Sequence, residues 1–176
     1  MALIDLIRDI KRVAYLEGHF VTRSGKPTTY YIDKYLFQTN PKILDPLADA
    51  LAGLFPSPDT YDRIGAPELG AVPIGALLSV KLNKPFVIVK KQAKDYGTSR
   101  QIEGPYFPGE RIVVVEDILT TGGAVLNACN ALVSASLNVV EIIGIINREE
   151  GAFENLAAAG FPHVKALMTR TDLQSC

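Results

Sequence analysis

A stretch of eight residues, 116–123, brings two acids, two hydroxyls and two glycines together. It reads EDILTTGG and follows the apolar run RIVVV at 111–115. Backbone N–H groups of a glycine-rich turn, threonine hydroxyls and the N-terminus of a helix bind anions such as phosphate. The carboxylates of Glu116 and Asp117 repel a phosphate, but they accept hydrogen bonds from a diol. A sugar with a phosphate and vicinal hydroxyls, such as a ribose 5-phosphate, satisfies both halves of the stretch.

The elements that must position this stretch are a buried strand before it and a helix after it. Four apolar runs have the length of strands, namely 63–66, 85–89, 111–115 and 139–146. Three segments have helical character, namely 70–82, 123–136 and 149–159. Continuous apolar strands separated by helices indicate a parallel sheet covered on both faces. We therefore expect an α/β fold with a central, mainly parallel sheet flanked by helices.

The acids and the turn are expected at one edge of that sheet. In open parallel sheets, ligands bind beyond the carboxyl ends of the strands. Glu116 and Asp117 should therefore emerge where the strand 111–115 ends, and the helix should begin near Ala124. The hydroxyls of Thr120 and Thr121 then lie in the turn between strand and helix.

The N-terminal part has a different pattern. Apolar residues repeat at helical spacing over 3–16, and Gly18 follows as a plausible end of that helix. Residues 19–21 and 28–36 suggest a short hairpin around the turn-like SGKP, and a helix is expected over 41–55. Further along, 91–109 lacks a regular pattern, and such a segment is usually a functional lid or disordered.

Composition narrows the class of protein. The chain has 176 residues, 48% apolar and 21% charged, with a formal net charge of −1, so we expect one soluble globular domain over 1–176. This balance lacks the basic excess of duplex nucleic-acid binders, and no apolar stretch has the ~20 residues of a membrane helix. Cys129 and Cys176 lie far apart without a secretory leader, so we expect no disulfide framework and a cytoplasmic location.

The segment VVVEDILTTGG resembles the phosphoribosyl pyrophosphate (PRPP) signature of type I phosphoribosyltransferases. The resemblance implies their fold, with a small N-terminal hood over about 1–38 and a flexible lid over about 91–109. It also implies that Glu116 and Asp117 hold the ribose hydroxyls while residues 120–124 wrap the 5-phosphate. Taken alone, the segment also fits a solvated strand end followed by a capped turn.

Three further stretches resemble orotate phosphoribosyltransferases within that family: FVTRSGKPTTYYID at 20–33, KKQAKDYGT at 90–98 and IINREEG at 145–151. The first implies a cation, Arg23, near the nucleotide substrates, and a wall against the pyrimidine ring made by Tyr31 and Ile32, although Ile32 departs from an aromatic residue. The third implies that Arg148 and Thr120 bind orotate. Without the resemblance, a half-buried hairpin and a local ion pair of Arg148 with its neighbouring acids would explain these residues.

The second of these stretches implies a basic loop that closes over the pyrophosphate in a neighbouring subunit's site. Lys90, Lys91 and Lys94 are its cations, and we expect Lys94 to be the main catalytic one. Tyr96 stands where a histidine is frequent in the family and is not a near-neutral acid. Taken alone, a lysine cluster on a loop is usually a solvated surface.

A further departure lies in GAPELGAVPIG at 65–75, where Leu69 replaces a lysine of some members. Pyrophosphate contacts in that turn are then expected from backbone N–H groups, and Glu68 is expected to approach Mg²⁺ only indirectly. This departure places more of the catalytic work on Lys91 and Lys94.

The implied reaction transfers the phosphoribosyl group from PRPP to orotate, giving orotidine 5-phosphate and pyrophosphate, in pyrimidine (UMP) biosynthesis. Lys94 and Asp117 are the expected catalytic residues, Mg²⁺ is expected to bind through PRPP without direct protein ligands, and a homodimer is expected to share its lids. The residues implied in PRPP binding are Arg23, Lys90, Lys91, Lys94, Tyr96, Glu116, Asp117, Ile118, Leu119, Thr120, Thr121, Gly122, Gly123 and Ala124. Those implied in orotate binding are Tyr31, Ile32, Thr120 and Arg148.

Two alternatives stay open at this point. The PRPP motif does not name the base, so the chain could serve a purine or uracil. It could also be a regulator that senses PRPP or a nucleotide without chemistry, although a sensor has no need of a lysine lid. His19 and His163 are expected to be surface or structural residues, and Cys129 is expected to pack in the core.

Overall fold

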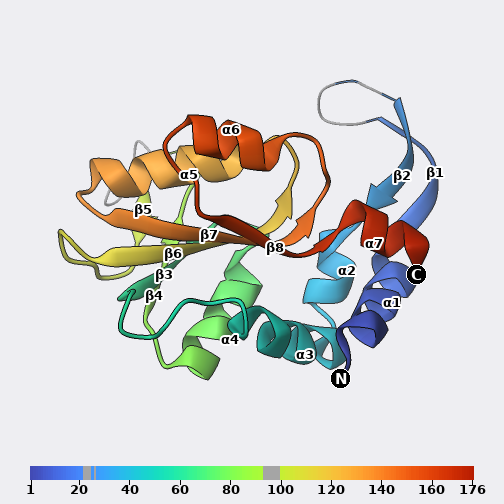
Figure 1. Cartoon of the computed structure of the whole chain (residues 1–176), viewed down its shortest axis with the longest axis horizontal. Helices are drawn as coiled ribbons and strands as arrows, with labels where there is room; N and C mark the ends of the chain where they lie inside the picture. Colours follow the sequence, from blue (N-terminus) through green and yellow to red (C-terminus); the bar gives the residue numbers. More distant parts are fainter. Residues whose placement is uncertain (22–24, 26, 93–99) are drawn as a thin grey trace.

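A six-stranded sheet forms the centre of the protein (Figure 1). The computed structural model describes residues 1–21, 25, 27–92 and 100–176. The strand order is β5-β4-β3-β6-β7-β8, with bounds β3 (Arg63–Pro67), β4 (Phe86–Val89), β5 (Ile102–Glu103), β6 (Arg111–Leu119), β7 (Asn138–Asn147) and β8 (Val164–Thr169). Neighbouring strands are parallel except for β4 and β5. The predicted α/β class with a mainly parallel sheet is confirmed.

Helices cover both faces of this sheet. In Figure 1, α3 (Pro41–Ala52) and α4 (Val72–Leu82) lie below it, and α5 (Gly123–Ser134) and α6 (Ala152–Ala158) lie above it. Strand β6 explains why both faces are apolar. Val113 and Val115 belong to the core that contains the buried residues of α3 and α4, whereas Ile112 and Val114 belong to the core that contains those of α5. An unbroken run of valines and isoleucines is what a strand buried on both sides requires.

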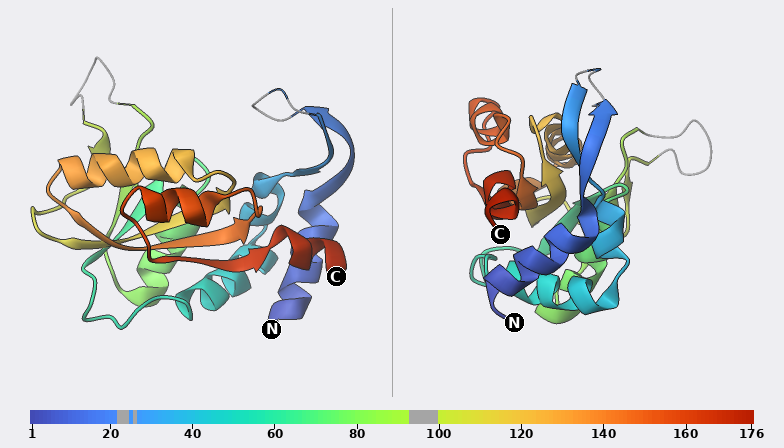
Figure 2. Two further views of the ribbon diagram at one scale, coloured as in Figure 1. Left: turned by 45° about the horizontal axis from the view of Figure 1, so that its top comes forward. Right: turned by 90° about the vertical axis from the view of Figure 1, so that its right-hand side faces the viewer.

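The N-terminal elements form a separate group beside the sheet. They are α1 (Leu3–Ala14), β1 (Tyr15–Val21), β2 (Pro27–Ile32) and α2 (Lys34–Gln38), and α7 (Arg170–Ser175) from the C-terminal end joins them. The antiparallel pair β1–β2 rises away from the body (Figure 2). Lys11 of α1 donates to the Gln174 carbonyl of α7 at 3.1 Å. The helix predicted over 3–16 ends earlier, because the chain enters β1 at Tyr15.

The hairpin also ends before the predicted boundary at residue 36. Strand β2 stops at Ile32, and Asp33 then caps α2 by accepting from the Tyr35 N–H at 3.1 Å. A side chain that satisfies an N-terminal helix donor favours a turn into helix over a continued strand. The hairpin itself was predicted from the sequence, whereas α2 was not.

The irregular segment predicted over 91–109 is partly ordered into the sheet. Ile102 and Glu103 form β5, an edge strand antiparallel to β4, and the Lys90 N–H donates to the Gln101 carbonyl at 2.8 Å. Ile102 is buried in the core. Residues 93–99 of the predicted lid lie outside the described residues, and residues 102–103 belong to the sheet.

Cys129 illustrates how the helix after β6 packs. Its thiol is fully buried in the core shared with β6, and burial raises its pKa to about 12. Both cysteines are free, and the prediction that Cys129 is a packing residue is confirmed. No helix in the described part of the chain is long and apolar enough to cross a membrane.

Candidate active site

A cavity of about 880 Å³ lies where β6 and β7 end, between the turn after β6 and the β1–β2 hairpin. Its walls come from three places in the sequence. They are Glu116 and residues 118–125; Pro27, Thr28 and Tyr30 of β2; and Arg148, Glu150 and Arg170. The first of these three groups was expected at this edge of the sheet, because ligands bind beyond the carboxyl ends of parallel strands. The fold brings the residues of the other two groups to the same cavity.

The turn after β6 has the form of an anion cradle. Gly122 has a φ of +84°, and a Cβ on it would lie 3.1 Å from the Leu156 side chain. Glycine is therefore required there. Asn155 of α6 donates to the Thr121 carbonyl at 2.9 Å and fixes the turn from behind. Because α5 begins at Gly123, its N-terminus faces the cavity, where the helix dipole favours an anion.

Both acids lie within β6 and not beyond its end, which corrects the sequence prediction. Strand β6 runs on to Leu119 because β7 pairs with it that far, with Glu116 opposite Gly144 and Leu119 opposite Asn147. Glu116 is 7% exposed and lines the cavity, whereas Asp117 is 3% exposed and points to the other side of the strand, toward Lys34. Successive side chains of a strand alternate between faces. The two acids therefore have different surroundings.

Asp117 forms an ion pair that the sequence did not predict. Lys34 of α2 places its Nζ 2.7 Å from the Asp117 Oδ2, while Oδ1 accepts from the Ile118 N–H at 2.6 Å. Burial lowers the pKa of Lys34, but the hydrogen bond and charge of Asp117, together with the charge of Glu116, raise it above its usual value overall. Lys34 and Asp117 are 83 positions apart, so no local pattern indicates the pair.

Gly70 leaves room for this ion pair. A Cβ on Gly70 would overlap the Asp117 Oδ2 and would lie 2.6 Å from the Lys34 Nζ. Gly70 belongs to the turn between β3 and α4, the same turn that contains Glu68 and Leu69. The backbone of this turn therefore lies directly against the Lys34–Asp117 ion pair, at the neighbouring strand's carboxyl end.

Glu116 has a strongly perturbed carboxyl group. Burial raises its pKa well above the usual value, and the neighbouring Asp117 charge acts in the same direction. Its side chain accepts from the Asp117 N–H at 3.0 Å, which opposes the shift only in part. A perturbed acid at a cavity wall is typical of a functional site.

We expect the ligand-free protein to lose stability as the pH rises, because the folded state holds the Glu116 proton more tightly than the unfolded state does. The loss begins near the ordinary pKa of 4.5 and is complete above the raised value. Glu116→Gln removes this term, so the stability of the variant relative to wild type should increase as the pH rises above 4.5. Urea unfolding at several pH values measures it. Glu154→Gln, at an exposed position of α6, is the control, and parallel pH curves for wild type and Glu116→Gln would contradict the expectation.

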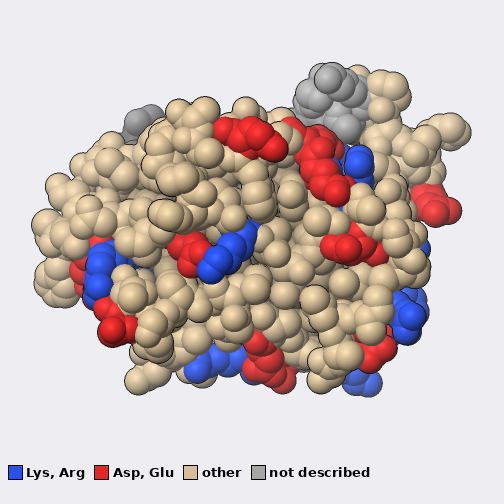
Figure 3. Space-filling view, in the orientation of Figure 1, with Lys and Arg blue, Asp and Glu red and all other residues tan. Residues whose placement is uncertain are grey.

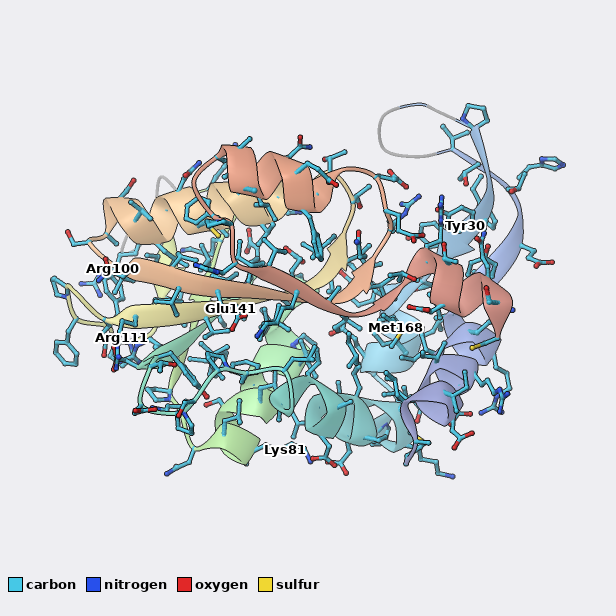
Figure 4. All side chains as sticks on the ribbon, viewed as in Figure 1. Tyr30, Lys81, Arg100, Arg111, Glu141 and Met168 are labelled. Atoms are coloured by element: carbon cyan, nitrogen blue, oxygen red, sulfur yellow. The ribbon has the colours of Figure 1, made fainter. Side chains whose placement is uncertain are left out.

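The hairpin presents Tyr30 to the cavity, whereas the sequence predicted Tyr31 and Ile32. Figure 4 labels Tyr30 on the hairpin, beside α7. The Tyr30 ring stacks on Tyr15 with centroids 5.3 Å apart, and its hydroxyl accepts from Arg148 at 3.1 Å. Tyr31 is 51% exposed and packs against Phe20, and Ile32 is buried in the core. The prediction followed the family position, but alternation along β2 turns neighbouring side chains to opposite faces.

Arg148 lies where predicted, at the end of β7. Its Nη2 is 2.9 Å from the Glu150 Oε1, and its guanidinium carbon is 5.3 Å from the centre of the Tyr30 ring. The local ion pair that the sequence offered as an alternative therefore exists, and it exists inside the cavity. Arg170, which also lines the cavity, was missed, because it lies on an element that the sequence did not predict.

Of the three lysines predicted to bind pyrophosphate, Lys90 and Lys91 are among the described residues. Lys90 pairs with Glu103 of β5 at 2.7 Å, and the Lys91 N–H donates to the Glu68 carboxylate at 2.7 Å. Arg23, Lys94 and Tyr96 lie outside the described residues. Within the residues described, no group of three or more His, Cys, Asp or Glu side chains is arranged to hold a metal ion.

Comparison with known proteins assigns this architecture. The family described as "Phosphoribosyl transferase domain" matches residues 37–161. An orotate phosphoribosyltransferase of Natronomonas pharaonis is 43% identical in an alignment of 176 positions that covers 97% of this chain and 95% of the relative. This chain belongs to the orotate phosphoribosyltransferase family. A relative of the same name from Methanocella arvoryzae is 39% identical, with 97% of this chain and 95% of the relative covered.

A solved structure agrees with the family assignment. The orotate phosphoribosyltransferase of Aeropyrum pernix superposes with a TM-score of 0.86 at 27% identity, covering 99% of this chain and 97% of that chain. The predicted fold, that of a type I phosphoribosyltransferase, is confirmed together with the family resemblance. The cradle at 120–124 is thus the segment that the resemblance named as the phosphate loop.

Proposed function

We propose that the protein transfers the 5-phosphoribosyl group from PRPP to orotate, forming orotidine 5-phosphate and pyrophosphate, in pyrimidine (UMP) biosynthesis. One observation supports this most strongly: a single cavity contains the anion cradle after β6 and, opposite it, the Tyr30 ring with Arg148. The first suits a ribose 5-phosphate, and the second suits a flat, acidic ring. The relatives that carry this activity in their names match nearly the whole chain.

PRPP binds with its 5-phosphate in the turn after β6 and its ribose hydroxyls toward the acids Glu116 and Asp117. Residues 120–124 bind the 5-phosphate through backbone N–H groups and hydroxyls. Glu116, which lines the cavity, accepts from the ribose hydroxyls, and Asp117 supports the diol side from the other face of β6, where Lys34 holds it. The pyrophosphate then lies toward the turn that contains Gly70, where backbone N–H groups are the donors.

The reaction needs orientation and charge more than a protein nucleophile. The orotate nitrogen forms a bond to the anomeric carbon as the bond to pyrophosphate breaks, with inversion. Tyr30 and Arg148 hold the ring in line for this attack, and Lys91 and Lys94 stabilise the charge that develops on the leaving group. A closed lid excludes water from the oxocarbenium-like sugar.

Mg²⁺ fits this arrangement as an ion carried by PRPP. It prefers phosphate oxygens and water over cages built only from protein, and the Asp117 oxygens already accept from Lys34 and the Ile118 N–H. When bound, the ion neutralises charge on the pyrophosphate. Glu68, which accepts from the Lys91 N–H, stays a candidate for an indirect, water-mediated contact.

We propose a homodimer in which each lid serves the neighbouring site, within a single phosphoribosyltransferase domain over 1–176. Apolar side chains exposed on the hood support a second copy covering it, with Val21 at 74% and Tyr31 at 51% exposure. Two free cysteines suit the reducing cytoplasm, which is the location we propose.

Measuring pyrophosphate release with orotate, uracil, adenine, guanine and xanthine in parallel tests the proposal. We expect turnover with PRPP and orotate and at least about a hundredfold less with uracil, because uracil lacks the carboxylate that an arginine of the pocket would bind. Turnover with a purine alone, or with uracil as well as with orotate, would favour a phosphoribosyltransferase for another base. Tight PRPP binding without turnover of any base would favour a sensing regulator.

A further inference from the structure

A second arginine faces the cavity from the far end of the chain. Arg170 is the first residue of α7, and the reciprocal hydrogen bonds of Thr169 and Asp172 fix where that helix begins. Glu149 accepts from the Thr171 N–H at 3.1 Å and from its hydroxyl at 2.7 Å, and it lies 3.4 Å from the Arg170 Nε. The position of the Arg170 guanidinium is therefore set by two elements, the β7–α6 loop and α7.

Arg170 and Arg148 line the cavity together with Tyr30. The Arg148 Nη2 donates to the Tyr30 hydroxyl at 3.1 Å, and the nearby Tyr30 raises the pKa of Arg170. Tyr30 itself is held from behind by Tyr15, whose hydroxyl accepts from Gln174 of α7 at 3.0 Å. The hairpin, β7 and α7 thus build one rigid corner of the cavity.

Arg148 and Arg170 carry like charges in one cavity, so nearby carboxylates must balance them. In the ligand-free protein the acids of the NREEG segment supply it, since Glu150 lies 2.9 Å from Arg148 and Glu149 lies beside Arg170. Figure 3 shows acidic side chains next to a basic one on the surface between α6 and the hairpin. Glu149 is tied to Thr171, whereas Glu150 pairs with Arg148 at 2.9 Å and its charge also acts on Arg170. An anion entering the cavity therefore competes with Glu150.

We propose that Arg170 is a second specificity-determining residue, which binds the orotate carboxylate together with Arg148 when that carboxylate displaces Glu150. The inference rests on the proposed function. A guanidinium pair matches a planar carboxylate better than it matches a neutral ring. When a neutral base binds, Arg148 stays paired with Glu150 and Arg170 with Glu149. The two arginines therefore favour an acidic pyrimidine over uracil.

The 5-phosphate is a poorer partner for Arg170 than the carboxylate is. The phosphate cradle is built from residues 120–124 and the start of α5, whereas Arg170 shares Tyr30 with Arg148 on the hairpin side. Orotidine 5-phosphate and uridine 5-phosphate differ only in the carboxylate on the ring. Their relative affinity therefore measures carboxylate recognition separately from recognition of the phosphate and sugar.

Calorimetric titration of both nucleotides into the full-length protein tests the proposal. In Arg170→Gln, we expect orotidine 5-phosphate to bind about tenfold more weakly, as for loss of a hydrogen bond to a charged group, while uridine 5-phosphate binds as before. Arg170→Lys should recover part of the loss. Glu150→Gln, which removes the competing acid, should tighten orotidine 5-phosphate binding by about two- to fivefold. Arg8→Gln, an exposed arginine on α1, is the control, and unfolding midpoints check that each variant is folded.

Equal weakening of both nucleotides in Arg170→Gln would overturn the proposal, because Arg170 would then act on the phosphate or on folding. Unchanged binding of both would overturn it as well. These failures differ from failure of the proposed function, in which wild type itself would bind the two nucleotides equally and would not turn over orotate.

Discussion

Gly70→Ala is expected to lower kcat/KM for PRPP by about a hundredfold, the scale of a displacement of about 1 Å in a catalytic group. The added methyl group would overlap the Asp117 Oδ2 and come within 2.6 Å of the Lys34 Nζ. Asp117 cannot yield easily, because its other oxygen accepts from the Ile118 N–H within β6. The ion pair with Lys34 must therefore open or the turn must move. Steady-state kinetics with PRPP varied at saturating orotate measures the effect.

Gly53→Ala is the matched control for this variant. Gly53 ends α3 with a φ of −66°, and a Cβ there would have its nearest neighbour 3.4 Å away. We expect wild-type kinetics from it. Wild-type kinetics from Gly70→Ala as well would show that the Lys34–Asp117 pair does not need its present geometry for catalysis.

Lys94→Ala is expected to lower kcat by roughly tenfold to a thousandfold, the range for loss of one charge contact made in the transition state. Lys94 lies outside the described residues, so this expectation rests on the family resemblance and on the chemistry of the leaving pyrophosphate. PRPP binding should weaken less than kcat, because the charge on pyrophosphate grows as the glycosidic bond breaks. Single-turnover rates and PRPP affinity, measured separately, test the difference.

Lys42→Ala serves as its control, because Lys42 is exposed on α3, away from the cavity. It removes the same charge from the chain without touching the lid. Near-normal kcat in Lys94→Ala would remove Lys94 from the mechanism. A fall in kcat of the same size in both variants would point to a general effect of charge.

The sheet and the phosphate cradle were predictable because both are local in sequence. An isoleucine and three valines run without a break over residues 112–115 of β6, as in a strand buried on both faces. The glycines and threonines that follow have few other uses in that order. The end of β6 was predicted too early, however, because its pairing with β7 keeps Glu116 and Asp117 inside the strand.

The contacts that complete the site were not predictable in the same way. Lys34 pairs with Asp117, 83 positions away, and Arg170 lines the same cavity as Tyr30, 140 positions away. Such neighbours depend on how the N-terminal elements pack against the sheet, which hydrophobic periodicity does not indicate. The preference for Tyr31 over Tyr30 failed for a related reason, because the face of a two-stranded ribbon cannot be assigned without knowing what it packs against.

Short edge elements account for the remaining differences. Strand β5 has two residues, and α7 has six. Neither is long enough to show a hydrophobic period. Strand β8 has only Met168 fully buried, since it lies at the sheet edge, and its pattern is correspondingly weak. One of these elements, α7, positions Arg170 in the cavity.

A crystal structure with orotidine 5-phosphate bound tests the central claim most directly. We predict that the 5-phosphate lies in the turn at 120–124, that the ribose hydroxyls face Glu116, and that the ring lies beside Tyr30 and Arg148. A nucleotide bound elsewhere, with this cavity empty, would contradict the account.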